Sequence, residues 1–327
     1  MKKIFLFLCC FVLSVFVLDR TVSIIFEKLI FNKTYSGESG GNLNYLFQKK
    51  NNINFLIAGS SRAKNMINPD SLSVLSGQGY NAGVNGVGGV LYMNAFFELL
   101  LNKNIKPHYI ILQTDVRDFS IKRSNGNRAE ITRLYPFIDD SKILQQYSKQ
   151  LGFEESLKLK LKLYRFNGKF YNILINRFKN NSNNNSNGFN ALTGKMTFMN
   201  ENETIDKLDH FDSLKINALN NIITICDENK IKLFIVFPPR YKNVDSEEMH
   251  LSDLLSQLKL KNECYVVDMI DIKKYPDLQD QSNWKDEAHL NGIGANKFTS
   301  HLNDSIQTKL KVMAEFENPI TFKNIKF

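Results

Sequence analysis

The feature that most constrains the fold is a set of short apolar runs separated by longer stretches with helical spacing. Each run is four to six residues long, which is the length of a strand rather than of a helix. Runs that are apolar throughout are typical of strands buried on both faces, as in parallel sheets. The four runs are Ile53–Ala58, Tyr109–Leu112, Lys232–Phe237 and Cys264–Met269.

Helical patterns alternate with these runs, over residues 90–104, 213–230, 246–262 and 291–311. Strands that alternate with helices favour an α/β fold with three layers, in which an open and mostly parallel sheet carries helices on both faces. Ligands of such sheets bind at the carboxyl ends of the strands. We therefore expect the functional residues at that edge.

The rest of the chain is organised around this domain, which we predict over residues 51–327. Residues 27–50 look like a polar stalk, and about 120–212 break the α/β rhythm with Lys-rich helical stretches. This insertion is interpreted either as a lid beside the sheet or as a solvated excursion without a role in recognition. The Asn/Ser run Asn180–Asn190 predicts a flexible loop within it.

The N-terminus predicts a membrane segment. Lys2 and Lys3 precede an uncharged run, Ile4–Leu18, and Thr21–Phe26 is largely apolar again. An uncleaved signal anchor over residues 1–26 is favoured over a cleaved signal peptide, because the one candidate cleavage site, at residues 21–23, follows two charged residues. Lysines before the span predict a cytoplasmic N-terminus and an extracytoplasmic domain; cleavage would give a secreted protein.

The net charge and the cysteine content limit the classes of partner and cofactor that we expect. The net charge is +9, but the sequence has no clustered basic recognition helix, so we expect no nucleic-acid partner and favour attraction to anionic envelope polymers. Cys226 and Cys264 lie in the extracytoplasmic part, where either a disulfide or two buried free thiols is compatible with the sequence. No Cys/His metal spacing is present, and neither a metal nor an organic cofactor is expected.

Two motifs follow the first strands. Gly59, Ser60 and Ser61 come directly after the first apolar run, and a serine at a strand-to-helix turn can expose its hydroxyl at the sheet edge. Alone, this motif is more typical of a helix N-cap. The second motif, residues 80–86 (YNAGVNG), has glycines whose backbone N–H groups could stabilise an oxyanion, or it is a glycine-rich turn without chemistry.

The third motif, residues 286–291 (DEAHLN), lies just before the last helix. An aspartate three residues before a histidine can hydrogen-bond the imidazole and select its tautomer. The histidine then serves as general base to a serine. We therefore predict Ser61, Asp286 and His289 as a catalytic triad.

In order and context, these motifs resemble the blocks of the SGNH/GDSL hydrolase superfamily. IAGSSR is similar to its first block, with Ser61 at the nucleophile position, and YNAGVNG to the second, with Gly86 at the oxyanion-hole glycine. DEAHLNGIGANKF is similar to the last block. The resemblance covers residues 53–119 and 213–310 and implies the flavodoxin-like fold of that superfamily.

One block departs from the pattern, because the chain has Leu112-Gln113-Thr114-Asp115-Val116-Arg117-Asp118 where the resemblance implies GxND. Arg117 stands at the position of the asparagine that donates to the oxyanion. It is a candidate donor beside the Ser61 and Gly86 N–H groups, or it forms an ion pair with Asp115 or Asp118. Gln113 and Thr114 are alternative donors.

Three further residues flank the predicted site. Arg62 and Asn85 are candidate substrate-binding residues, and Arg62 is equally compatible with covering the surface of the helix. Trp284, the single tryptophan, is interpreted as a packing residue in preference to a carbohydrate platform.

The resemblance implies a membrane-anchored serine esterase or O-acyltransferase. A GSS first block and an N-terminal anchor resemble envelope proteins such as the D-alanyl transfer protein of teichoic acid synthesis and the O-acetyltransferases of exopolysaccharides. The expected substrate is an acylated envelope polysaccharide, and a membrane acyltransferase is a possible partner. The alternative is an inactive SGNH-like domain that binds glycan or scaffolds such a partner.

Overall fold

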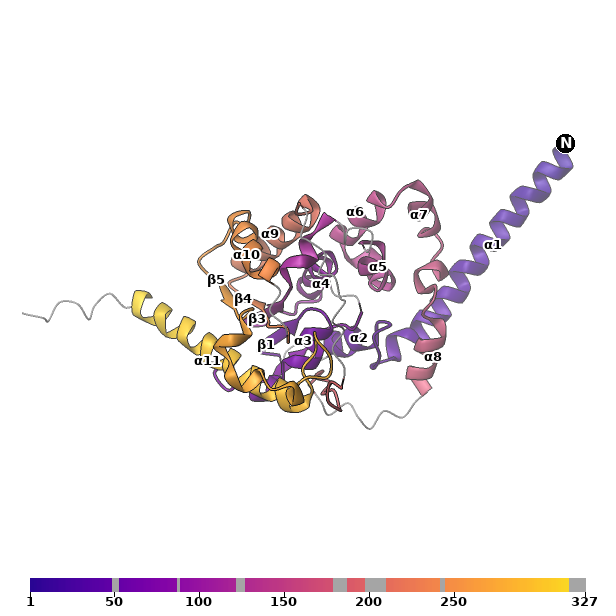
Figure 1. The fold of residues 1–327 in the computed structure, drawn as a ribbon. Coiled ribbons are helices and arrows are strands. Elements are labelled where there is room, and N and C mark those ends of the chain that lie inside the picture. Colours follow the sequence, from indigo (N-terminus) through magenta and orange to yellow (C-terminus); the bar gives the residue numbers. More distant parts are fainter. Residues whose placement is uncertain are drawn as a thin grey trace, which may run out of the picture. The chain divides into compact units, whose positions relative to one another are not determined.

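The computed structural model describes residues 1–48, 53–86, 89–121, 127–178, 187–197, 210–241 and 245–317 (Figure 1). The chain divides into two compact units. One consists of residues 1–51, 91–105 and 124–185, and the other of residues 52–90, 106–123 and 186–327. The second unit, called here the sheet unit, carries all the predicted strands.

The sheet unit contains a five-stranded parallel sheet within the described residues, in the order β2-β1-β3-β4-β5. Each of the four apolar runs forms one strand, and every pairing is parallel. The expected α/β class is therefore confirmed. The fifth strand, β2, is part of the YNAGVNG motif and is only three residues long. The strands are β1 (Phe55–Ala58), β2 (Gly79–Asn81), β3 (Tyr109–Gln113), β4 (Lys232–Phe237) and β5 (Cys264–Asp268).

Helices cover the sheet because alternate strand residues point to opposite faces. Ile57, Ile111 and Val236 belong to one buried cluster with apolar residues of α3 (Ser61–Met66) and α11 (Gly292–Glu317). On α9 (Ser213–Glu228), which contacts β4, Leu219 and Ile222 are buried outside that cluster. We infer that α9 lies on the other face.

The remaining elements of this unit are α10 (Asp245–Ser256) and short 3₁₀ helices. α9, α10 and α11 overlap the helical patterns expected over 213–230, 246–262 and 291–311. The 3₁₀ helices are η2 (Pro69–Ser71), η3 (Val116–Phe119), η7 (Ile272–Lys274), η8 (Pro276–Leu278) and η9 (Gln281–Asn283).

The other unit, called here the helical unit, begins with α1 (Lys2–Leu29), whose side chains from Ile4 to Leu18 are exposed. Among the described residues, α1 is the helix long and apolar enough to cross a membrane. The unit also contains η1 (Phe31–Lys33), α2 (Gly41–Gln48), α4 (Val90–Asn102), α5 (Asn127–Thr132), η5 (Tyr135–Asp140), α6 (Lys142–Gln150), α7 (Phe153–Lys158), η6 (Leu163–Phe166) and α8 (Phe170–Phe178).

The segment expected as a stalk folds into this unit. Within residues 27–48, Phe31, Leu46 and Phe47 are buried, and the rings of Phe31 and Phe47 both contact Phe137 of η5. The glycines and polar residues of this segment predicted a stalk, but the apolar residues between them are numerous enough to pack. Of the loop expected at Asn180–Asn190, residues 180–186 lie outside the described part.

Candidate active site

The turn that carries Ser61 begins where β1 ends. Gly59 has a φ of +145°, and a Cβ there would lie 2.7 Å from the carbonyl oxygen of Gln113. Only glycine allows the chain to turn this close to β3. Ser60 then caps α3 by accepting from the Arg62 N–H at 3.2 Å, and Ser61 is the first residue of the helix. Ser60 thus has the N-cap role that the sequence offered, and Ser61 lies at the strand-to-helix turn.

The Asp–His turn is held by its own backbone. Trp284 and Leu290 form an antiparallel bridge, and the Lys285 N–H donates to the carbonyl of His289 at 2.8 Å. Asp286 Oδ1 accepts from the backbone N–H groups of Ala288 at 2.8 Å and His289 at 2.9 Å. The carboxylate is therefore oriented by the turn, independently of the histidine ring.

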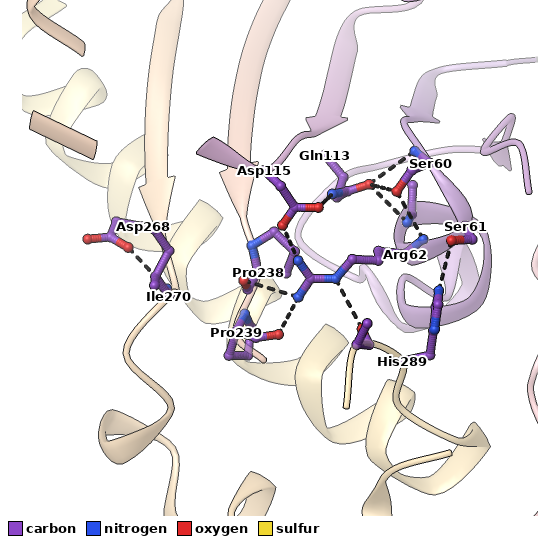
Figure 2. Close-up of polar contacts among 12 residues, drawn as sticks. Ser60, Ser61, Arg62, Gln113, Asp115, Pro238, Pro239, Asp268, Ile270 and His289 are labelled. Atoms are coloured by element: carbon purple, nitrogen blue, oxygen red, sulfur yellow. Dashed lines mark hydrogen bonds and ion pairs between the residues drawn. The ribbon is translucent and has the colours of Figure 1, made fainter. Parts of the chain in front are cut away.

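The structure brings the three predicted triad residues together. Ser61 Oγ lies 2.8 Å from His289 Nε2 (Figure 2), and His289 Nδ1 lies 2.9 and 3.0 Å from the two Asp286 oxygens. With its proton on Nδ1, the ring donates to the carboxylate, and Nε2 accepts the serine hydroxyl. This is the relative order of groups that activates a serine nucleophile.

The electrostatics of Asp286 favour its charged form. Burial acts to raise the pKa of Asp286, but hydrogen bonds from the His289 ring and from the Ala288 and His289 amides together outweigh it, so its pKa is lowered. The charged carboxylate thus contributes stability above its ordinary pKa, and this contribution is lost as the pH falls through the lowered value. At neutral pH the ring faces a carboxylate.

Arg62 is engaged within the chain and is 3% exposed. Its guanidinium pairs with Asp115, donates from Nε to the carbonyl of Ala288 at 3.1 Å, and donates from Nη2 to the carbonyls of Pro238 and Pro239 (Figure 2). The sequence offered substrate binding or cover of the helix surface for Arg62, but its burial and these partners give it a different use. It ties α3 to the residue that precedes His289.

Gln113 connects the same parts at the end of β3. Its Oε1 accepts from the Ser60 N–H at 3.0 Å and the Ser60 hydroxyl at 2.8 Å, and its Nε2 donates to Asp115 at 3.3 Å (Figure 2). Gln113 was an alternative oxyanion donor, but these bonds occupy its amide with Ser60 and Asp115. Arg117 lies in η3 and is half-buried. Asp115, one of its two expected partners, pairs with Arg62 instead.

The second motif runs alongside the turn that carries Ser61. The Val84 N–H donates to the carbonyl of Gly59 at 3.0 Å, and Asn81 Nδ2 donates to the carbonyls of Ala63 and Ile67 at the end of α3. At Gly83, a Cβ would lie 2.5 Å from the Lys64 nitrogen. Sequence reasoning assigned no role to Asn81, although its amide joins the motif to α3.

Asn85 and Gly86 lie farther along this loop. Asn85 Oδ1 accepts from Asn65 of α3 at 3.3 Å, and Gly86 is exposed with a φ of +74°. The positive φ explains the glycine, since other residues adopt it at a cost. Residues 87 and 88 lie outside the described part of the chain.

Residues 187–197, called here the strap, join all three motifs. The strap bonds to the second motif through Asn81, to α3 through Lys64, and to the last motif through Gly292 and Trp284, by backbone hydrogen bonds of 2.6 to 3.0 Å. Asn291 adds a side-chain bond to the carbonyl of Gly194 at 3.0 Å. The sequence did not predict this role, because the strap has no periodic pattern.

The structure decides two of the alternatives that the sequence left open. Trp284 is fully buried, its Nε1 donates to the carbonyl of Leu278 at 2.7 Å, and its ring packs edge-on against Tyr241 at 5.8 Å, so the packing interpretation is confirmed. Cys226 and Cys264 are free thiols. Among the described residues, no group of three or more His, Cys, Asp or Glu side chains is placed to hold a metal ion.

In comparisons with known proteins, no family model and no curated protein matches this chain.

Proposed function

We propose that the protein is a membrane-anchored, extracytoplasmic serine esterase or O-acyltransferase of the SGNH type that acts on acyl esters of envelope polysaccharide. The observation that carries the proposal is the hydrogen-bonded series from Ser61 Oγ to His289 Nε2 (2.8 Å) and from His289 Nδ1 to Asp286 (2.9 and 3.0 Å). Packing alone does not require a serine to align in this order with an aspartate and a histidine from a turn that lies 228 positions away.

The proposed reaction has two steps. His289 Nε2 takes the hydroxyl proton as Ser61 Oγ attacks the ester carbonyl, and the same proton passes to the departing alkoxide when the acyl-enzyme forms. In the second step His289 takes a proton from water or from a sugar hydroxyl. The attack of that oxygen breaks the bond between the acyl carbon and Ser61 Oγ, which takes the proton back from His289, and the product is an acid or a new ester.

The oxyanion is assigned to backbone N–H groups. The Ser61 and Gly86 amides are the proposed donors, with Arg117 as a third candidate from η3. Preorganised donors of this kind contribute roughly 3 kcal/mol each in known acyl-transfer enzymes. The Gln113 and Asp115 side chains are used to support the first block, so they are not part of this assignment.

The triad does not determine whether water or a sugar hydroxyl accepts the acyl group, because both reactions use the same three groups. Features outside the triad determine the acceptor. The anchor-like α1 and the net charge of +9 favour an anionic envelope polymer as substrate. A purified protein that releases acetate from an acetylated glycan but never passes it to a glycan acceptor would restrict the function to the esterase.

A serine-reactive fluorophosphonate probe tests the proposal, and the adjacent serines supply a matched control. Ser61→Ala should abolish labelling. Ser60→Ala should retain it, since Ser60 Oγ bonds to Gln113 and caps α3. The proposal fails if Ser61→Ala labels as well as the native chain, or if both variants label equally while remaining folded by circular dichroism.

A second candidate function is a non-catalytic domain that binds glycan or scaffolds a partner acyltransferase. The observation that favours it is the third block, whose polar side chains Gln113 and Asp115 form internal bonds. Tight glycan binding without turnover of any simple ester, and without probe labelling, would support this function over the first.

A further inference from the structure

In the helical unit, α1 is attached to a distant segment at the point where its uncharged run ends. Asp19 is buried, and its carboxylate accepts from the backbone N–H groups of Lys162 at 2.9 Å and Leu163 at 3.0 Å. Arg20 donates to the carbonyl of Lys160 at 3.0 Å. Residues 160–163 are therefore fixed beside Asp19 and Arg20.

This attachment sets the depth of the segment if α1 spans a membrane. Ile4–Leu18 provides fifteen residues, and a hydrocarbon core of ~30 Å needs ~20 residues of helix. Val22, Ile24 and Ile25 are exposed and extend the apolar surface by about two turns. A span of ~20 residues that begins at Ile4 ends near Ser23, four residues or ~6 Å past Asp19, which places residues 160–163 close to the boundary between the acyl chains and the headgroups.

The segment around this attachment exposes apolar side chains. Phe153 is 81% exposed, Leu157 52% and Leu161 38%, whereas Leu159 between them is buried. Their lysine neighbours alternate with them along residues 157–162 (LKLKLK). Long lysine side chains can extend to the phosphate level while adjacent leucines enter the apolar boundary, which is the pattern of an interfacial segment.

A hollow of about 360 Å³ adjoins the segment and has an excess of positive charge. Arg20, Lys149, Lys160 and Arg165 line it, with Asp139 as the one carboxylate in the lining. Arg165 pairs with Asp139 at 2.6 Å, which balances one of the four cations. Phe16 of α1 also lines the hollow, so that its wall is continuous with the lipid-facing side of the helix.

We propose that residues 153–163 are a second membrane contact, and that the hollow seats the phosphate of an anionic phospholipid between Arg20, Lys149 and Lys160. Phe153, Leu157 and Leu161 enter the boundary between headgroups and acyl chains. The proposal rests on the α1 span of the proposed function, but not on its catalytic chemistry. Under this proposal the helical unit rests on the lipid surface, in contrast to the alternative of a solvated excursion.

Helix α8 offers a matched comparison within the same unit. Phe178 is 73% exposed, close to the value for Phe153, but Asn176 of α8 is contacted by Ser36, beyond the end of α1. α1 itself continues ten residues past Asp19, about 15 Å at 1.5 Å per residue. The two phenylalanines are thus similarly exposed, but Phe178 is expected to lie farther from the hydrocarbon than Phe153.

The test uses tryptophan quenching by phospholipids brominated near the top of the acyl chain, with the full chain reconstituted in phosphatidylcholine nanodiscs containing phosphatidylglycerol. Three single variants are compared with the native chain, whose buried Trp284 sets the background: Phe11→Trp in the span, Phe153→Trp in the segment and Phe178→Trp in α8. Phe11→Trp and Phe153→Trp should lose emission relative to the native chain, and Phe178→Trp should remain at background.

The outcomes test the α1 span and the second membrane contact separately. If Phe11→Trp is quenched but Phe153→Trp is quenched no more than Phe178→Trp, the second contact is wrong and the span stands. If Phe11→Trp is not quenched, the span and the contact both fail. Replacing Lys149 and Lys160 by glutamine should remove the dependence of Phe153→Trp quenching on phosphatidylglycerol; an unchanged dependence would overturn the phosphate seat.

Discussion

The burial of Arg62 leads to a quantitative prediction about the sheet unit. The side chains of Arg62 and Asp115 are 3% and 7% exposed. Arg62→Ala would leave the Asp115 carboxylate buried without its counter-charge and the carbonyl of Ala288 without this donor. Removing one partner of a buried pair costs about 3–5 kcal/mol, a large part of a typical stability of ~5–15 kcal/mol.

Urea unfolding in detergent micelles, followed by tryptophan emission, measures this cost. Trp284 is the only tryptophan and is fully buried in the same unit, so its emission reports the unit that contains the site. The free energy of unfolding falls by ~1–3 kcal/mol per M urea. With a slope near the upper end of this range, the urea midpoint should fall by about 1–2 M. An unchanged midpoint would refute the argument that the buried contacts of Arg62 stabilise the sheet unit.

Two further variants separate charge from geometry. Arg62→Lys keeps the charge, but one ammonium cannot reproduce the planar set of donors that reaches Asp115, Ala288 and the proline carbonyls. It should therefore be intermediate in stability and slower in probe labelling. Arg62→Met combined with Asp115→Asn removes both charges and should recover most of the loss, because a buried pair can be replaced by neutral groups at little cost. Strict additivity of the two changes would contradict the pairing.

Three other predictions concern the same unit. Asp286→Asn should slow fluorophosphonate labelling strongly, by up to ~10⁴-fold as for serine proteases, because the amide favours the wrong histidine tautomer; labelling at the native rate would remove Asp286 from the triad. Gly83→Ala should lower the thermal midpoint and cost about 1–3 kcal/mol, because its Cβ would lie 2.5 Å from the Lys64 nitrogen. Burial raises the pKa of Cys226 and of Cys264 to about 12, so the folded state disfavours the thiolates and loses stability as the pH rises above the ordinary thiol pKa. In a variant whose Cys9 and Cys10 of α1 are replaced by serine, both buried thiols should react with maleimide only on unfolding, and fast native reaction near pH 8 would contradict this.

The sequence by itself determined the elements whose signals are local. Four apolar runs correspond to β1, β3, β4 and β5, because burial on both faces demands apolar residues at consecutive positions. β2 was not predicted as a strand, since three residues with a glycine carry no such run. The Asp–His turn was also readable, because its hydrogen bonds join residues only three apart.

Only the tertiary structure decided which side chains face one another. Arg62 looked like a surface or substrate residue, and its burial depends on Asp115, 53 positions away, and on Pro239, 177 positions away. Asp19 looked like an interruption of an apolar helix, and its partners are 143 and 144 positions away. The desolvation of a charge is set by everything packed around it, so a sequence pattern that reports only neighbours along the chain cannot reveal it.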